Sequence, residues 1–403
     1  MKSKLITLIA LATCCYLSAQ SRFVRTDGKF LVAPDGQHLM LRGINLGNWL
    51  EPEGYLFGLE GGPQSPREIE DFFSELIGPT EAAKFWQAFR DAYITEDDIR
   101  FIRQTGSNSV RIPLHYKFFL AGNDEGLARL DGVIGWAKKY GLYVILDMHC
   151  APGGQTGTNI DDSFGYPWLY ESREDQVLTI SIWKRIAEHY RDNTTVLGYD
   201  LLNEPIPHFP QLQRYNSDLE PLYKRITEAI RQVDTHHVII LGGAQWDSNF
   251  KVFGPPFDHN VMYTFHKYWV EPTQASIQPY IEFRDRYNVP IWLGESGENN
   301  DAWVHTFTGV LEQNQVGWAF WPYKKMEQGS AFVAWQKPAN WDEIVAFAKR
   351  HDYTGDAEKQ IAMRPSLEHS RAALQDLLTK IQLRNCRTNP GYIQALELKV
   401  PPS

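Results

Sequence analysis

Eight short apolar runs with the composition of buried β-strands alternate with segments of helical periodicity along most of this chain. The strands are predicted over residues 39–45, 109–114, 143–149, 196–203, 238–243, 261–266, 290–294 and 317–321, and the helices over 94–104, 127–140, 175–191, 219–233, 277–287, 303–313 and 341–349. Strands that alternate with helices form parallel sheets, and eight such units close into a barrel. We therefore predict an α/β fold, a single (β/α)8 TIM barrel, for which 403 residues suffice.

Two further segments frame the predicted barrel. Turn residues between short apolar runs predict an N-terminal hairpin over 23–35, and an extra C-terminal helix is predicted over 366–383. A long polar insertion follows the first strand, from Glu51 to Pro79. Since no linker, repeat or low-complexity tract interrupts the pattern, we expect residues 20–403 to form one domain.

The N-terminus has the pattern of a secretory signal peptide. Two lysines precede an apolar run from Leu5 to Ala12, and small residues follow at Ser18 and Ala19, so residues 1–19 are predicted to be removed. An alternative is a lipoprotein signal with Cys14 as the lipidated residue. Either signal predicts export, to the periplasm, the exterior or the cell surface. No other segment has the roughly 20 apolar residues that span a bilayer.

Composition excludes several classes of function. The net charge of -9 and the scattered basic residues argue against a nucleic-acid groove or an anionic membrane surface as partner. Beyond the signal only Cys150 and Cys386 remain, so one disulfide is possible and a closed zinc site is not. Thirteen Trp and nineteen Tyr fill a core and also suit flat ligands such as sugar rings.

Polar and aromatic side chains recur at the predicted carboxyl ends of the strands, where TIM barrels place their reactive groups. Any one of them has a structural explanation, such as a buried ion pair, a core histidine or simple packing. Their recurrence at corresponding positions favours a functional site. The set comprises Asn45, Arg111, His149, Asn203, Glu204, Trp246, His266, Tyr268, Glu295 and Trp321.

Two glutamates within this set indicate glycoside hydrolysis. Glu204 ends one apolar run, which Pro205 should stop, and Glu295 ends another. The reaction needs one protonated and one ionised carboxyl group, about 5–5.5 Å apart for retention or roughly 6.5–9.5 Å apart for inversion. Arg111 beside Glu295 would keep that carboxylate ionised as a nucleophile, which leaves Glu204 as the general acid.

The ordered set Arg111, His149, Asn203-Glu204-Pro205, His266 with Tyr268, Gly294-Glu295-Ser296 and Trp321 resembles glycoside hydrolase family 5, the cellulase-type family of retaining barrels, over about residues 39–325. The resemblance implies that Glu204 is the acid/base and Glu295 the nucleophile, with Arg111 and Tyr268 bonded to Glu295. It further implies that Asn203 binds the 2-hydroxyl group of the sugar, that His149 and His266 line the subsite and that Trp321 is the platform.

Residues 42–52, 147–155 and 321–324 are similar to the exo-β-1,3-glucanase branch of this family, although Asn48 and the loop 156–168 depart from its pattern. We therefore expect a monomeric retaining hydrolase, without cofactor, that cleaves β-glucosidic linkages of glucans or oligosaccharides, with the 51–79 insertion favouring exo action. Alternatives are an endo-β-1,4-glucanase, a β-mannanase or a glycosylceramidase. The last would want an exposed apolar lip near the groove, for which Phe250, Phe253, Pro255, Pro256 and Phe257 are candidates, although loop packing is the favoured role for them. A carbohydrate-binding barrel without turnover is the alternative that is not an enzyme.

Overall fold

The structure is a computed structural model that describes residues 22–327, 329–350 and 357–402. The predicted signal peptide and the alternative lipid site at Cys14 lie outside the described residues. None of the described helices is both long and apolar enough to cross a bilayer.

Eight parallel strands close into one barrel, which confirms the predicted (β/α)8 fold. Around the barrel each strand pairs with the next along the chain, and the eighth pairs with the first. The strands are β4 (Arg42–Asn45), β5 (Ser109–His115), β6 (Tyr143–Cys150), β7 (Val196–Asp200), β8 (Val238–Gly242), β9 (Val261–Tyr268), β10 (Ile291–Gly297) and β11 (Gly317–Phe320). Their residues are almost all buried, as expected for a parallel sheet covered on both faces.

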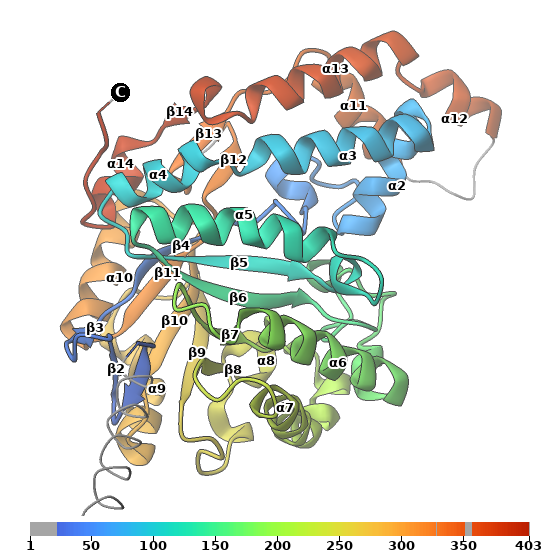
Figure 1. The fold of residues 1–403 in the computed structure, drawn as a ribbon. Coiled ribbons are helices and arrows are strands. Elements are labelled where there is room, and N and C mark those ends of the chain that lie inside the picture. The colour runs from blue at the N-terminus through green and yellow to red at the C-terminus, as the bar shows by residue number, and fades with distance from the viewer. Residues whose placement is uncertain (1–21, 328, 351–356, 403) are drawn as a thin grey trace, which may run out of the picture.

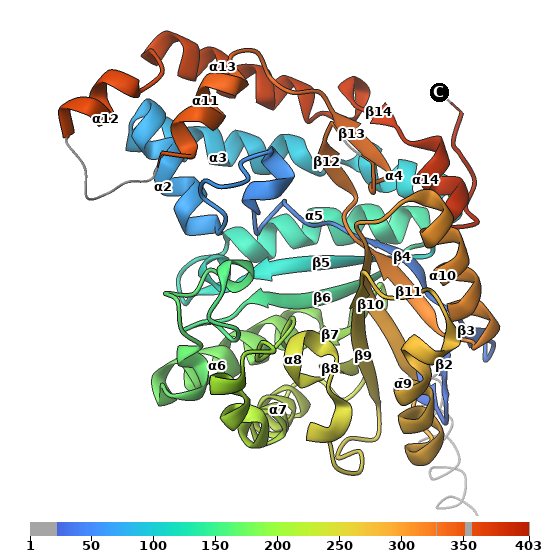
Figure 2. The same ribbon diagram turned by 180° about the vertical axis from the view of Figure 1, so that it is seen from behind.

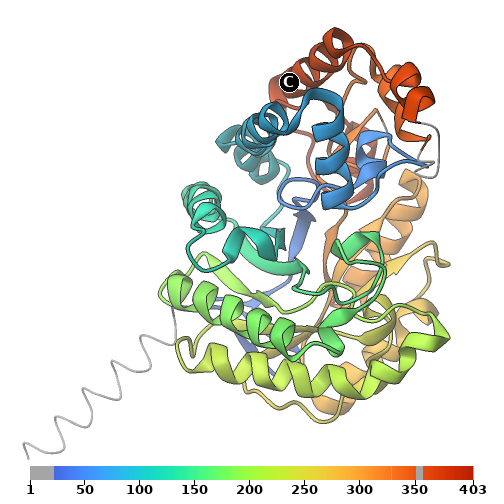
Figure 3. The same cartoon turned by 90° about the vertical axis from the view of Figure 1, so that its right-hand side faces the viewer.

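Helices lie outside the strands and connect them (Figures 1 and 3). They are α4 (Glu96–Gln104), α5 (Glu125–Tyr140), α6 (Arg173–Tyr190), α7 (Asn216–Arg231), α8 (Ala244–Asp247), α9 (Gln274–Tyr287) and α10 (Asp301–Gln313). Gly141 ends α5 with a left-handed φ of 73°, where a side chain would be strained. Because the eight strands are parallel, their carboxyl ends all lie at one end of the barrel.

The predicted N-terminal hairpin is part of a small antiparallel sheet that covers the opposite end of the barrel. Its strands are β1 (Arg25–Asp27), β2 (Phe30–Val32) and β3 (His38–Leu39). Val24 and Leu31 from this segment pack with barrel side chains such as Ile145, Ile240 and Trp292 in one apolar cluster. That end is therefore a packed core, and the polar residues gather at the other end.

The insertion after the first strand is more ordered than its polar composition indicates. It forms the 3-10 turn η1 (Gly54–Phe57) and α2 (Pro66–Ile77), and α3 (Pro79–Tyr93) follows after Gly78, which caps both helices. The prediction missed these helices because Ile69, Phe72, Phe73 and Leu76 form a helical apolar stripe within an otherwise polar segment.

The C-terminal part of the chain packs on that insertion (Figure 2). The extra C-terminal helix is confirmed as α13 (Leu367–Lys380), but it has neighbours that the sequence did not predict. They are α12 (Ala357–Met363), α14 (Pro390–Ala395) and the sheet of β12 (Lys324–Met326), β13 (Val333–Trp335) and β14 (Arg387–Thr388). From the predicted helix α11 (Trp341–Ala348), Trp341 donates a 2.8 Å hydrogen bond to the carbonyl of Phe57. Together they hold the insertion beside the barrel mouth.

Candidate active site

A cavity of about 640 Å³ opens at the carboxyl ends of the strands. Eight of the ten residues predicted for the site line it, namely His149, Asn203, Glu204, Trp246, His266, Tyr268, Glu295 and Trp321. The other two, Asn45 and Arg111, are fully buried below it. Arg111 is the third residue of β5 and not its last, which explains its depth.

The carboxyl groups of Glu204 and Glu295 face each other across this cavity. One oxygen of each lies within 4.8 Å of the other and of a ring nitrogen of His266. The Nδ1 atom of His266 is 2.8 Å from Oε1 of Glu204 and 3.7 Å from Oε2 of Glu295. This spacing belongs to the short range typical of retaining glycosidases and leaves no room for an inverting water between the groups.

Glu295 lies in β10 and is held by two donors. Arg111 donates from Nη1 to Oε1 at 2.5 Å, and the Tyr268 hydroxyl donates to Oε2 at 3.0 Å. Its side chain is only 6% exposed. The two donors fix the orientation of this buried carboxylate, and the guanidinium group places a positive charge beside it, as suits a carboxylate nucleophile.

Arg111 is the centre of a buried charge network. It donates to Asp200 at 2.9 Å and lies 3.1 Å from Asp147, in addition to its bond to Glu295. Burial opposes the charge of Arg111, but these carboxylates outweigh burial and raise its pKa above the ordinary value. Burial raises the pKa of Asp147 and of Asp200 to about 7, against the lowering effect of Arg111.

Two asparagines complete the support of this network. Asn45 accepts from Arg111 at 3.1 Å and donates to the carbonyls of Gly294 and Phe320, so it braces the strands that flank Glu295. Asn203 accepts from Arg111 at 2.9 Å and directs its amide nitrogen to His149 at 3.2 Å. Only Asn203 of the two reaches the cavity.

Glu204 has a different environment. β7 ends at Asp200, earlier than the predicted Asn203, and Glu204 then adopts a left-handed φ of 47°. Its backbone N–H donates to Asp247 at 3.2 Å. Burial raises the pKa of Glu204 to about 7, although His149 and Arg111 act in the opposite direction. Near neutral pH this carboxyl group therefore retains a proton that it can donate.

His149 and Trp321 form one wall of the cavity. Their rings stack at a centroid distance of 5.5 Å, and His149 Nδ1 lies 2.8 Å from Asp147. Burial lowers the pKa of His149 to about 4, so the ring is neutral. A Cβ atom on Gly47 would lie 2.3 Å from the Trp321 ring, so only glycine lets the indole reach this position.

Several lining residues escaped the sequence analysis. Glu53 and Tyr55 come from the insertion, and the Tyr55 hydroxyl accepts a 2.6 Å hydrogen bond from Trp321. Trp269 and Glu298 closely follow predicted site residues, and Glu298 is paired with Lys325 at 2.8 Å. The similarity of residues 42–52 to the exo-glucanase pattern was the one signal that pointed near Glu53 and Tyr55.

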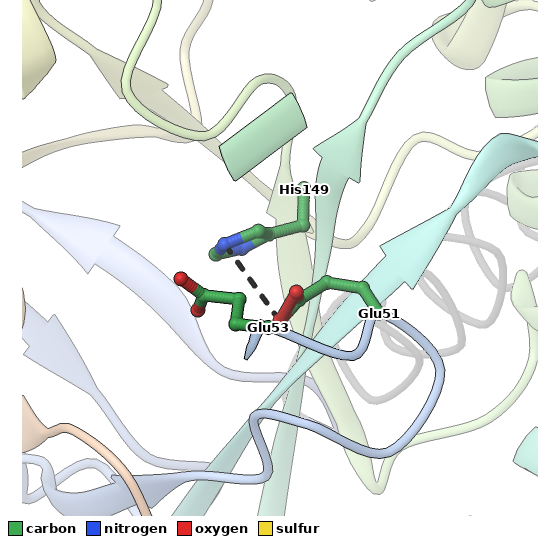
Figure 4. A group of neighbouring side chains, drawn as sticks. All are labelled: Glu51, Glu53 and His149. Carbon is green, nitrogen blue, oxygen red and sulfur yellow. Dashed lines mark ion pairs between the residues drawn. The ribbon is translucent and has the colours of Figure 1, made fainter. Parts of the chain in front are cut away.

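Glu51, Glu53 and His149 form a second acidic group beside the cavity (Figure 4). Glu51 is fully buried, and neither of its carboxylate oxygens has a hydrogen-bond partner among the described residues. Burial, followed by the charge of Glu53, raises the pKa of Glu51 well above its ordinary value. Two carboxylates and an imidazole suit a divalent cation. However, Nε2 of His149 already faces the Asn203 amide at 3.2 Å, so we assign no cation here.

A family model described as "Cellulase (glycosyl hydrolase family 5)" matches residues 74–327. The chain is 28% identical over 379 residues to a "Beta-xylosidase" of Phanerodontia chrysosporium, which covers 83% of this chain and 78% of that protein. It is 26% identical over 328 residues to "Endoglucanase C" of Acetivibrio thermocellus, covering 64% of this chain and 92% of the other.

A third relative, "Glucan 1,3-beta-glucosidase" of Candida oleophila, is 30% identical over 275 residues, which cover 62% of each chain. Together these relatives are consistent with a place near the exo-1,3-glucanase branch. Since the family model matches more than half of the chain, the protein belongs to glycosyl hydrolase family 5 and is an O-glycosyl hydrolase of the retaining type.

Proposed function

We propose that the protein removes terminal sugars from β-glucans or derived oligosaccharides as an exo-β-1,3-glucanase or β-glucosidase, by double displacement. The short separation of Glu204 and Glu295 carries the mechanistic part of this proposal. Glu53 and Tyr55 line the cavity beside Trp321, and this position supports the proposal of exo action.

In the first step a carboxylate oxygen of Glu295 attacks the anomeric carbon, and the bond from that carbon to the leaving-group oxygen breaks. The proton of Glu204 passes to this oxygen, so the aglycone leaves as an alcohol. Arg111 and Tyr268 hold Glu295 in line for attack. The product of this step is a glycosyl ester on Glu295.

In the second step Glu204, now ionised, takes a proton from water. The water oxygen bonds to the anomeric carbon and the ester bond to Glu295 breaks, which restores both carboxyl groups. Trp321 offers an aromatic face to the C–H surface of the sugar, and the Asn203 amide is placed for the 2-hydroxyl group. Each step inverts the configuration at the anomeric carbon, so the two steps together retain the β configuration.

The shape of the cavity supports exo action. Tyr55 and Glu53 come from the insertion and stand beside the Trp321 platform, where Tyr55 is bonded to the indole. In the same segment Phe57 packs on Phe73 of α2 and on Trp86 and Phe89 of α3, and both helices contact α13. A wall next to the platform would limit the number of sugar units that bind on that side, as exo action requires.

Endo cleavage of β-1,4-glucan is the second candidate, because "Endoglucanase C" aligns over 92% of its own length. The glycosylceramide alternative loses part of its basis. Phe250 and Phe253, two of the residues considered for an apolar lip, are buried, with 8% and 7% of their surface exposed, which agrees with the loop-packing role. They pack on each other and on Tyr263 inside the fold.

The test is a substrate panel with product analysis over time. Aryl β-glucosides, β-xylosides and β-mannosides would establish the preferred sugar, and laminarin, pustulan, cellulose and mannan the linkage. Exo action predicts glucose as the first product from laminarin. A ladder of oligomers would overturn exo action, and Glu295→Gln serves as the inactive control.

We also propose export of the protein, on the basis of its N-terminal sequence. The mass of the mature N-terminus tests this. A chain that begins after Ala19 supports a cleaved signal peptide, and a lipid-modified Cys14 supports a surface lipoprotein. An intact N-terminus would contradict both.

A further inference from the structure

Three consecutive residues, none of them glycine, adopt left-handed backbone angles next to Glu204. Gln245, Trp246 and Asp247 have φ values of 55°, 55° and 58°. L-residues visit this region singly and at a cost, so a run of three persists only where the surroundings impose it. Such strain is typical of functional sites.

Neighbouring groups impose this turn. The Gln245 amide donates to Asn216 at 2.9 Å and accepts from Asn249 at 2.6 Å. The N–H of Trp246 donates to the carbonyl of Ile206. A Cβ atom on residue 242 would lie 1.9 Å from Oδ1 of Asp247, so only Gly242 leaves space for this carboxyl group.

The turn inserts Asp247 directly beneath Glu204. Asp247 is fully buried, and its Oδ2 accepts the backbone N–H of Glu204 at 3.2 Å. The same oxygen is 3.2 Å from Nε2 of His266, whose Nδ1 is 2.8 Å from Oε1 of Glu204. Asp247 thus reaches both the backbone and the side chain of Glu204 but does not line the cavity.

We propose that Asp247 is a positioning residue for Glu204, acting through the Glu204 amide and the His266 imidazole. The inference rests on the proposed function, which makes Glu204 the acid/base. It adds a residue that was absent from the predicted site.

The direction of the hydrogen bonds follows from the surroundings. Burial lowers the pKa of His266 to about 3, so the ring is neutral and has one N–H. Burial, followed by the charges of Asp200 and Glu204, raises the pKa of Asp247 well above its ordinary value, which favours the protonated acid. Oδ2 of Asp247 lies 3.2 Å from Nε2 of His266, so in the proposed arrangement the protonated acid directs its proton toward Nε2, and Nδ1–H donates to Oε1 of Glu204.

This arrangement frees the other oxygen of Glu204 for the reaction. Oε1 is engaged by His266 in both protonation states of Glu204, so the mobile proton resides on Oε2. Without Asp247 the imidazole can place its proton on Nε2, and Nδ1 then accepts the Glu204 proton and withholds it from the leaving group. The ionisable groups around Asp247 and Glu204 are Glu53, Arg111, Asp147, His149, Tyr170, Asp200, His208, Tyr223, His266, Tyr268, Tyr280 and Glu295.

Two variants and two substrates test the inference. Phenyl β-glucoside needs a proton on its leaving group, whereas 2,4-dinitrophenyl β-glucoside does not. Asp247→Ala should slow the first by about 100-fold and the second little, because general acid catalysis contributes 10²–10⁴-fold. The alkaline limb of kcat/KM should move to higher pH. Asp247→Asn can keep the donor toward His266 but then loses the acceptor of the Glu204 N–H at the same atom, so it should restore part of the loss.

Control variants distinguish a positioning role of Asp247 from a purely structural role. Asp218→Ala changes an exposed aspartate on α7 and should behave as the wild type. Equal loss on both substrates, an unmoved limb, or asparagine as damaging as alanine would overturn the inference. If the wild type cleaved no aryl glycoside at all, the proposed function would fail and this inference with it.

The wild-type protein offers a direct spectroscopic readout that no folding defect can obscure. Long-range ¹⁵N–¹H spectra, assigned with His266→Gln, report which ring nitrogen has the proton. We expect a protonated Nδ1 and an unprotonated Nε2. The reverse tautomer in the resting enzyme would overturn the inference.

Discussion

The two carboxyl groups of the site are of the same residue type and lie within 4.8 Å, yet the protein gives them opposite environments. Around Glu295 the contacts are a guanidinium group and a phenol, both donors. Around Glu204 they are a neutral imidazole and a buried aspartate. A cationic group thus contacts Glu295, whereas none from the described part of the chain contacts Glu204.

The difference has its origin in the two strands. Glu295 lies within β10, where the side chain of Arg111 from β5 reaches it across the barrel interior. Glu204 lies beyond the end of β7, on a left-handed turn where burial dominates its pKa. Burial without a contacting cation among the described residues therefore favours a proton on Glu204, whereas Glu295 contacts the guanidinium group of Arg111.

Loss of the Glu295 carboxylate should have the largest effect. Glu295→Gln removes the nucleophile while it preserves the shape of the side chain. We expect kcat to fall by at least about 10⁴-fold on every substrate, including those with good leaving groups, since the covalent step is lost. Initial rates on aryl β-glucosides measure this. Glu271→Gln, an exposed glutamate near the mouth, is the matched control and should retain activity.

The loss of rate on removal of the Glu204 carboxyl group should depend on the leaving group. Glu204→Gln should slow phenyl glycosides by about 10²–10⁴-fold, because they leave only with a proton, and dinitrophenyl glycosides far less in the first step. A Brønsted plot of kcat/KM against the leaving-group pKa should steepen in the variant. A slope equal to that of the wild type would contradict the assignment of Glu204 as the acid.

The same substitution should stabilise the fold, in contrast to its effect on catalysis. The pKa of Glu204 is raised to about 7, so the folded state loses stability as pH rises from about 4.5 to 7 while the unfolded state ionises freely. Glu204→Gln removes that cost, and we expect a gain of about 3 kcal/mol in the free energy of unfolding at pH 8. Urea unfolding should show little gain at pH 4. Equal gains at both pH values would rule out this explanation.

A single hydrogen bond on the Glu295 side should matter less. Tyr268→Phe removes the donor to Oε2, and hydrogen bonds to charged groups contribute about 1.5–3 kcal/mol. We expect kcat/KM to fall by about 10- to 100-fold, since tenfold corresponds to about 1.4 kcal/mol. Unchanged kinetics would show that Arg111 suffices to hold the nucleophile.

The smallest effect is the pH dependence of the wild type near neutrality. Glu204 must be protonated in the first step, so kcat/KM for phenyl glycosides should be half-maximal near pH 7 and fall above it. In Glu204→Gln this limb should disappear. Its persistence in the variant would assign the limb to another group.

The barrel could be predicted from sequence because each strand is a short, nearly continuous apolar run. A run such as Val144–Met148, repeated in alternation with helical segments, is typical of a buried parallel strand. The positions of Glu204 and Glu295 followed, since carboxyl ends of parallel strands converge on one face. Helices α2 and α3 were missed because their apolar stripes lie within polar sequence and gain stability from contact with α13, far along the chain.

The residues missed at the site share a physical reason. Asp247 reaches Glu204 only through three left-handed residues, a conformation that no propensity scale predicts for Gln245 and Trp246. Tyr55 reaches Trp321 from a segment 266 residues away. Arg111 was predicted to lie at a strand end, whereas its place inside β5 makes it the buried support of Glu295.

The central claim is that Glu295 forms the covalent bond while Glu204 moves the proton. A 2-deoxy-2-fluoro-β-glucosyl substrate with a dinitrophenyl leaving group slows the second step and allows the ester to accumulate. Peptide mass spectrometry after trypsin digestion should then find the added glycosyl mass on the peptide 287–324, with fragmentation placing it on Glu295. A label on Glu204, or no ester together with a product of inverted configuration, would contradict the account.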